Sequence, residues 1–249
     1  SGFRKTETNF NSTKNINFYG CSFTFGEGLN QSETLPSYFS ESFPDYKINN
    51  FGVHGWGVNH AVNIIDKQSD SKINILLTYP EHSLRSSCKV SHSYNFPKYK
   101  ISNDSAMFIG NCETCFLKND FVCKILFKSE TFRFFHDRIF KSNLVTEVDI
   151  ELYFSLISEF IKISKAKDQK VLIGFLPTSL NKYYDRFSRL GYLKDVYTVD
   201  LRLLNYNKLS ARDSIYYLHK EDRHPSSLAN EIRANIISDY IDELKILKN

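Results

Sequence analysis

The sequence has little of what usually anchors a protein in a membrane or stabilises a small fold. It contains five cysteines among 249 residues, and an odd number in a chain of this length is not the pattern of a disulfide framework. No run of about 18 apolar residues occurs, so the sequence predicts no membrane span, and no signal peptide is recognisable. The first residue, Ser1, is not a methionine, so an upstream signal or anchor and the compartment, cytoplasm or periplasm, are left open.

Charge of one sign is not concentrated anywhere in the chain. There are 32 Lys and Arg residues against 28 Asp and Glu residues, for a net charge of +4, and no dense basic run occurs. Nucleic-acid binding is therefore not predicted, whereas an acidic polymeric substrate is compatible with this balance. The length and the 41% hydrophobic content favour one large α/β domain, residues 1–249, with a sizeable core.

Short apolar runs alternate with segments of helical periodicity. Strands are predicted at residues 16–20, 46–51, 73–79, 171–176 and 196–201, and helices at 33–43, 58–66, from 146 for about five turns, at 181–190 and from 225. This βαβ rhythm predicts a parallel sheet of about five strands with helices on both faces. The apolar face of the last helix is predicted to contain Leu228, Ile232, Ile236, Tyr240, Leu244 and Leu247.

Residues 86–142 interrupt this rhythm. They are rich in Ser, Asn and aromatic residues, with short alternating pieces at 99–101, 106–109 and 121–127. We interpret them as an insertion with one or two hairpins and a short helix, which forms a lid or a substrate wall.

The first predicted strand ends in the small-residue turn Gly20-Cys21-Ser22-Phe23-Thr24-Phe25-Gly26. Ligands bind beyond the carboxyl ends of strands in open α/β sheets, so Ser22 is a candidate nucleophile. The alternative is an ordinary turn in which this serine caps a helix. The pattern Gly-x-Ser-Phe-Thr-x-Gly resembles the first signature block of the SGNH/GDSL hydrolases, although Cys21 stands where Gly-Asp-Ser has its aspartate.

A second stretch, Asn50-Phe51-Gly52-Val53-His54-Gly55, resembles the second block of the same superfamily. There a glycine after the second strand donates its N–H to the oxyanion, and the matching position is Gly55. Glycine suits this position because its backbone can approach the reacting group closely. The alternative is a turn glycine beside a core tryptophan, Trp56.

The third block departs from the superfamily pattern Gly-x-Asn-Asp. The corresponding segment is Tyr79-Pro80-Glu81-His82-Ser83-Leu84-Arg85, with Glu81 at the asparagine position. An ionised glutamate cannot donate a hydrogen bond to an oxyanion. Either His82 or Arg85 supplies the stabilisation, or backbone groups do so alone; a structural ion pair between Glu81 and Arg85 is the alternative.

The fourth stretch, Glu221-Asp222-Arg223-His224-Pro225, precedes the terminal helix and resembles the last superfamily block. The resemblance implies that His224 is the general base for Ser22 and that an acid orients its ring. Asp222 is favoured for the acid, with Glu221 as the alternative.

The cysteines leave two other possibilities open. Cys21 is a formal alternative nucleophile, although its side chain is expected to point away from the open face of the turn. Cys112-x-x-Cys115 invites a metal or redox interpretation, with Cys123 and His136 as the nearby candidate ligands. The alternative is that both cysteines are buried or surface thiols in a hairpin.

The resemblance implies a three-layer α/β/α, flavodoxin-like fold and ester chemistry through an acyl-serine. A small-molecule or carbohydrate ester, notably a sugar O-acetyl group, is the expected substrate, and no cofactor is implied. Hydrolysis is favoured over acetyl transfer, which uses the same acyl-enzyme. A catalytically inactive binding module is the alternative, because the oxyanion asparagine and the aspartate of Gly-Asp-Ser are both replaced.

Overall fold

The structure is a computed structural model that describes residues 3–6, 11–68, 70–90, 95–112, 126, 129, 144–203, 214–219 and 222–247. Its internal contacts define two units. The first contains Ser1–Trp56, Lys67–Tyr79 and Ile161–Asn249, and the second contains Gly57–Asp66 and Pro80–Phe160. The interpretation of residues 1–249 as one domain stays a prediction.

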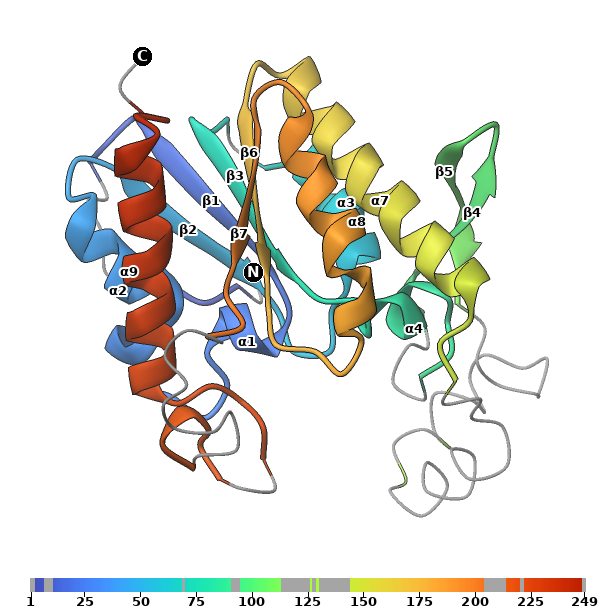
Figure 1. Ribbon diagram of the computed structural model, residues 1–249, viewed down its shortest axis with the longest axis horizontal. Coiled ribbons are helices and arrows are strands. Elements are labelled where there is room, and N and C mark those ends of the chain that lie inside the picture. The colour runs from blue at the N-terminus through green and yellow to red at the C-terminus, as the bar shows by residue number, and fades with distance from the viewer. Residues whose placement is uncertain are drawn as a thin grey trace. The chain divides into compact units, whose positions relative to one another are not determined.

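A five-stranded parallel sheet forms the centre of the first unit. Its strands are β1 (Asn15–Gly20), β2 (Lys47–Gly52), β3 (Ile73–Thr78), β6 (Lys170–Phe175) and β7 (Val196–Asp200), in the order β2-β1-β3-β6-β7 (Figure 1). All of β3 is buried, as expected for a central strand of a sheet covered on both faces. Counted along this sheet alone, the order is 2-1-3-4-5, the flavodoxin-like arrangement. The predicted three-layer α/β/α fold class is confirmed.

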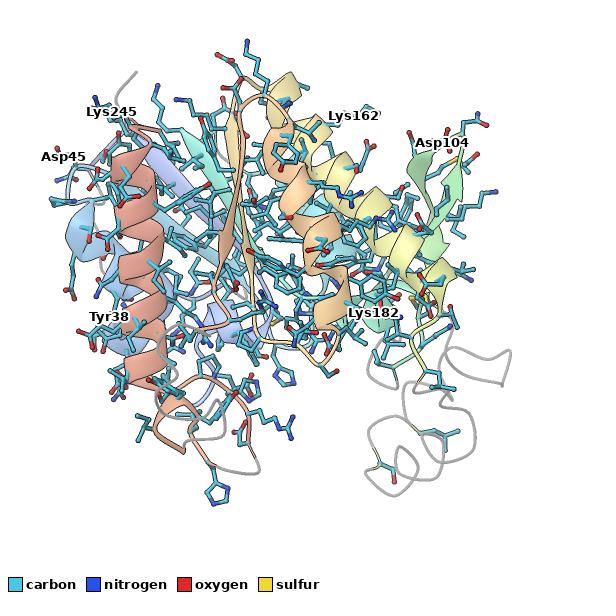
Figure 2. All side chains as sticks on the ribbon, in the orientation of Figure 1. Tyr38, Asp45, Asp104, Lys162, Lys182 and Lys245 are labelled. Atoms are coloured by element: carbon cyan, nitrogen blue, oxygen red, sulfur yellow. A yellow bond between two sulfur atoms is a disulfide. The ribbon has the colours of Figure 1, made fainter. Side chains whose placement is uncertain are left out.

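Two helices cover one face of this sheet, and they lie side by side (Figure 1). They are α2 (Leu35–Ser42) and α9 (Ser227–Glu243), which begin at the capping residues Thr34 and Ser226. Tyr38 of α2, labelled in Figure 2, shares a hydrogen bond of 2.6 Å with Ser227 of α9. These helices and the sheet enclose the main apolar cluster of the unit.

The apolar face predicted for the last helix is wrong at two of its positions. Leu228 and Leu244 are 41% and 49% exposed. The buried face of α9 is instead formed by Ala229, Asn230, Arg233, Ala234, Ile237, Ser238 and Ile241. This face mixes small residues with Arg233, Ile237 and Ile241, so the spacing of large apolar residues alone did not identify it.

A ladder of amides, all buried except the half-buried Asn49, runs across the other face of the sheet. Asn17 is in register with Asn49 on β2 and with Asn74 on β3, and its side chain is hydrogen-bonded to both. Asn74 also donates to Ser164 near the end of α7 (Glu147–Ala166) and to Gln169. Since a shifted strand would leave these amides unpaired, the ladder favours the observed register.

The segment at 181–190 is not one helix. It consists of η3 (Asn181–Tyr183), α8 (Tyr184–Ser188) and η4 (Arg189–Tyr192). Phe187 of α8 packs against Phe175 of β6, with ring centroids 4.6 Å apart.

The second unit contains the helices α3 (Val58–Ile65) and α4 (His82–Ser86), the first part of α7, and a hairpin of β4 (Pro97–Ser102) and β5 (Ser105–Asn111). The hairpin agrees with the strands expected at 99–101 and 106–109, whereas the piece at 121–127 lies outside the described residues except Leu126. Thr146 and Asp149 form the predicted helix start, with Thr146 Oγ1 donating to the Asp149 carboxylate at 2.7 Å. None of the described helices is long and apolar enough to cross a membrane.

The cysteines differ from the sequence-based expectation. Cys112 is not a thiol, because it forms a disulfide with Cys88, with a Cα–Cα distance of 5.5 Å. In this state it cannot serve as a zinc ligand. Cys115, Cys123 and His136 lie outside the described residues.

Candidate active site

Ser22 lies directly beyond the carboxyl end of β1. It is the first residue of the four-residue helix α1 (Ser22–Phe25), which Gly26 ends in a left-handed conformation with φ of 80°. Ser22 is therefore the first helical residue and not the cap, a position that Cys21 occupies. The Cys21 side chain is fully buried.

Close packing of α1 against β2 depends on Gly52. A Cβ atom at this residue would lie 2.5 Å from the backbone N of Phe25 and 2.8 Å from the carbonyl carbon of Thr24. The buried Asn50 adds a hydrogen bond from its side chain to the Thr24 carbonyl at 2.9 Å. The helix that carries Ser22 is thus held by its backbone as well as by apolar contacts.

The imidazole of His224 connects Ser22 to Asp222. Its Nε2 lies 2.8 Å from Ser22 Oγ, and its Nδ1 lies 2.5 Å from Asp222 Oδ1. The His224 backbone N–H also donates to Asp222 Oδ1 at 3.1 Å. This is the arrangement of nucleophile, base and orienting acid required for an activated serine.

The electrostatics of this group match its geometry. The hydrogen bond from the His224 side chain, followed by the one from its backbone N–H, lowers the pKa of Asp222. The carboxylate therefore stays ionised at neutral pH, as an acid that holds an imidazole must. Glu221, the alternative acid, lies outside the described residues.

The loop that carries His224 is fixed by backbone pairing. Tyr217 and Pro225 form an antiparallel bridge, and the Leu218 N–H donates to the His224 carbonyl at 3.0 Å. The Phe23 ring contacts the imidazole edge-on, with centroids 5.4 Å apart. The ring of His224 is therefore restricted on the side of α1.

The turn that contains Gly55 begins at the same edge of the sheet as the turn that contains Ser22. Gly20 and Gly52 are in register at the ends of the neighbouring strands β1 and β2, and the chain turns after both. Gly55 is buried and has a φ of 77°, a conformation that glycine adopts without strain. Its predicted role as an oxyanion donor stays a prediction.

From Pro80 on, the residues of the third motif belong to the second unit. Glu81 precedes α4, and His82 and Arg85 lie within it. His82 is 1% exposed, and burial, together with the charges of Arg85 and His60, lowers its pKa well below the usual value. His82 is thus a neutral imidazole at pH 7, which could donate a hydrogen bond but could not supply positive charge. The predicted roles of these three residues stay predictions.

Two residues beside His224 were not assigned from the sequence, although Glu27 directly follows the first motif and His54 lies inside the second. Glu27 Oε2 contacts His54 Nδ1, and one potential ligand atom from each of Glu27, His54 and His224 lies within 4.8 Å of the others. The sequence signal that could have found them is the placement of both motifs at neighbouring strand ends.

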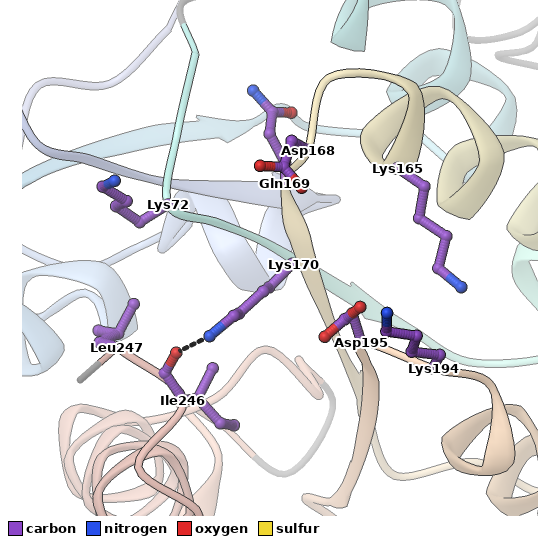
Figure 3. A pocket seen from close by; sticks show the side chains of 9 residues that line it. All are labelled: Lys72, Lys165, Asp168, Gln169, Lys170, Lys194, Asp195, Ile246 and Leu247. Atoms are coloured by element: carbon purple, nitrogen blue, oxygen red, sulfur yellow. Dashed lines mark hydrogen bonds between the residues drawn. The ribbon is translucent and has the colours of Figure 1, made fainter. Parts of the chain in front are cut away.

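A cavity of about 340 Å³ lies away from this edge of the sheet (Figure 3). Its lining includes Lys170 and Asp195 at the amino ends of β6 and β7, and the Lys170 ammonium donates to the Ile246 carbonyl. Ser22 and His224 do not line it.

Comparison with known proteins shows similarity in structure but not in sequence. The chain matches no protein-family model and no curated protein. A protein assigned to the G-D-S-L lipolytic family from Desulfitobacterium hafniense superposes with a TM-score of 0.56 at 13% identity, covering 91% of this chain and 99% of that one. LAE5, an α/β hydrolase enzyme from the Lake Arreo metagenome, superposes with a TM-score of 0.55 at 10% identity, covering 91% of this chain and 94% of LAE5. A member of the lipolytic G-D-S-L family from Veillonella parvula superposes with a TM-score of 0.54 at 11% identity, covering 92% of this chain and 99% of that one.

Proposed function

We propose, from the SGNH-hydrolase-like fold of this chain and from its Ser22–His224–Asp222 contacts, that the protein is a serine esterase. The contact that carries the proposal is the 2.8 Å hydrogen bond between Ser22 Oγ and His224 Nε2. These residues are 202 positions apart in the chain, so the fold alone brings them together.

In the proposed reaction, Ser22 Oγ attacks the ester carbonyl carbon while His224 Nε2 takes the hydroxyl proton. The protonated imidazole then gives this proton to the departing alkoxide, which leaves an acyl group on Ser22. Water attacks the acyl-serine with His224 again as the base, and release of the carboxylic acid restores the serine. Asp222 orients the ring and stabilises its protonated form.

The tetrahedral intermediate carries a negative oxygen that requires hydrogen-bond donors. The backbone N–H groups of Ser22 and Gly55 are proposed for this role. Ser22 N–H lies in the first turn of a helix, where it has no intrahelical partner. The positive φ of Gly55 explains why a glycine occupies its position.

Small acyl esters, with O-acetylated carbohydrate as the favoured class, are the proposed substrates. Support for this class is the resemblance of the motifs to the SGNH superfamily. The same acyl-enzyme could pass its acetyl group to a sugar hydroxyl instead of water, and hydrolysis is the favoured outcome. The mechanism requires no cofactor.

The decisive experiment is p-nitrophenyl acetate hydrolysis by wild type, Ser22→Ala and Ser42→Ala. Ser42 is an exposed serine at the end of α2, which makes it a matched control. We expect Ser22→Ala to lower kcat by about 10³-fold or more and Ser42→Ala to leave it unchanged. Equal rates for all three proteins would contradict the proposal.

The second candidate is a non-catalytic binding module. The observations that favour it are the replacements at Cys21 and Glu81, where the superfamily has the aspartate of Gly-Asp-Ser and the oxyanion asparagine. It predicts no wild-type turnover above that of Ser22→Ala. A cysteine enzyme would instead lose activity in Cys21→Ser and keep it in Ser22→Ala.

A further inference from the structure

We propose that Glu27, His54 and His224 form a binding site for a zinc ion, and that zinc bound there switches the active site off. One potential ligand atom of each side chain lies within 4.8 Å of the other two. The binding part of this inference stands on geometry alone, whereas the inhibition part rests on the proposed esterase function.

The three ligands come from three loops, each with a fixed backbone. Glu27 lies between Gly26 and Gly28, which have φ of 80° and 77°. The Arg4 guanidinium donates to the carbonyls of Gly26 and Leu29, at 2.6 Å each. The backbone position of Glu27 is therefore set by the loop and does not depend on a metal.

The Glu27 loop also contacts the loop of His224 directly. A Cβ atom at Gly28 would lie 2.4 Å from Leu218 Cδ1, and the Leu218 N–H is paired with the His224 carbonyl. His54 lies in the turn after β2, where the Trp56 N–H donates to the Val53 carbonyl at 3.2 Å. Three separate turns thus present one ligand each.

The donor set suits zinc. Two imidazoles and one carboxylate form a known three-ligand zinc arrangement that leaves the fourth position to water. Ligand atoms on one tetrahedral ion, at bond lengths of about 2.0–2.1 Å, are about 3.4 Å apart. The side chains of His54 and Glu27 are 68% and 38% exposed. Rotation of these side chains can shorten the distances between the ligand atoms from 4.8 Å to those that zinc requires.

Zinc at this site would disable the proposed catalytic group through either nitrogen of His224. Coordination through Nε2 removes the hydrogen bond to Ser22 Oγ, and coordination through Nδ1 removes the one to Asp222. Both ring nitrogens are needed in the proposed reaction, one as the base and one to hold the ring. Zinc should therefore inhibit without unfolding the protein.

The test is calorimetric titration of chelator-treated protein with zinc chloride. The variants are His54→Gln, Glu27→Gln and His224→Gln, and the control is Glu41→Gln, which changes an exposed glutamate on α2. We expect each ligand variant to lose one zinc equivalent, or to bind it about 100-fold more weakly, while the control binds as wild type does. The proposal would be overturned if wild type bound no zinc equivalent, or if the ligand variants bound zinc as tightly as wild type.

Two further measurements separate this site from the esterase function. Ser22→Ala should bind zinc as wild type does, even though it lacks the proposed nucleophile. In p-nitrophenyl acetate assays, zinc should inhibit wild type, and EDTA should restore the rate. The rate of His54→Gln with zinc should stay close to the rate of the same variant without zinc. Zinc binding without inhibition of an active wild type would exclude His224 from the ligands.

Discussion

Asp222 accepts two hydrogen bonds from the same residue, one from the ring Nδ1 and one from the backbone N–H of His224. The double contact fixes both the position and the orientation of the imidazole. It also requires that Nδ1 carry the proton, which leaves the lone pair on Nε2 facing Ser22. The carboxylate thus selects the tautomer that a general base needs.

Asp222→Asn should therefore lower kcat more than it changes KM. The asparagine amide can donate to Nδ1, and this moves the ring proton to Nε2, where it blocks the base. We expect a loss of about 10²- to 10⁴-fold in kcat for p-nitrophenyl acetate, measured in a steady-state assay. Asp45→Asn, which changes an exposed aspartate labelled in Figure 2, is the control. An Asp222→Asn variant with the kcat of this control would contradict the assigned role.

At the scale of elements, the position of Ser22 depends on how closely α1 approaches β2. The approach requires Gly52, because the backbone of α1 occupies the space of a Cβ atom there. Backbone atoms cannot rotate away as the end of a long side chain can. Gly52, the last residue of β2, thus contributes to the placement of Ser22.

Gly52→Ala should displace α1, and we expect it to destabilise the protein by about 1–3 kcal/mol and to reduce kcat. Urea unfolding and ester hydrolysis measure the two effects. The matched control is Gly191→Ala, whose Cβ would approach within 3 Å only one atom, the Thr198 hydroxyl at 2.9 Å. Equal stability and equal kcat in the two variants would show that α1 can move without consequence.

At the start of α7, within the second unit, the carboxylate of Asp149 is held by hydrogen bonds and an ion pair. Asp149 accepts hydrogen bonds from the Lys89 ammonium at 2.7 Å and from the Thr146 N–H at 2.9 Å. Burial alone would raise the pKa of Asp149, but these hydrogen bonds outweigh it, so the pKa is lowered. The carboxylate therefore contributes stability when it is ionised.

This pKa shift predicts how stability depends on pH. The stabilisation is fully present above the unfolded-state pKa of Asp149, about 3.9, and is lost as the pH falls through the lower folded-state value. Asp149→Asn should cost about 1–2 kcal/mol at pH 7. The gap between the thermal unfolding midpoints of wild type and variant should then narrow below pH 4, to be measured by circular dichroism. A gap independent of pH would mean that the charge of Asp149 does not matter.

For the whole molecule, the sheet could be predicted from the sequence because its strands are local apolar runs. Each predicted strand agrees with an observed one to within about two residues. The face of α9 could not be predicted in the same way, since residue size alone does not tell which side packs. Ala229 and Ala234 are fully buried on this face, whereas Leu228 is 41% exposed.

Contacts between distant segments were harder to predict. The SGNH resemblance paired Ser22 with His224 because the motifs carry that information. No motif indicated that Glu27 contacts His54, or that Cys88 reaches Cys112 across 24 positions. Such pairs depend on how turns and hairpins are placed in space, which periodicity does not encode.

The Cys88–Cys112 disulfide also bears on where the protein folds. Structural disulfides of this kind form and persist in oxidising compartments. The bond ties the segment after α4 to the end of the β4–β5 hairpin, within one unit.

Replacing Cys88 and Cys112 together by serine should destabilise the hairpin unit. Closing a loop of this length stabilises by about 3.5 kcal/mol in the chain-entropy model. The measurement is amide hydrogen exchange at Cys112 or its replacement, whose N–H donates to the Phe96 carbonyl at 2.7 Å. Exchange there should accelerate in the double variant and in wild type treated with dithiothreitol, while the reductant should leave the double variant unchanged. If dithiothreitol does not alter exchange in wild type, the disulfide contributes nothing to this unit, and its support for an oxidising compartment is lost as well.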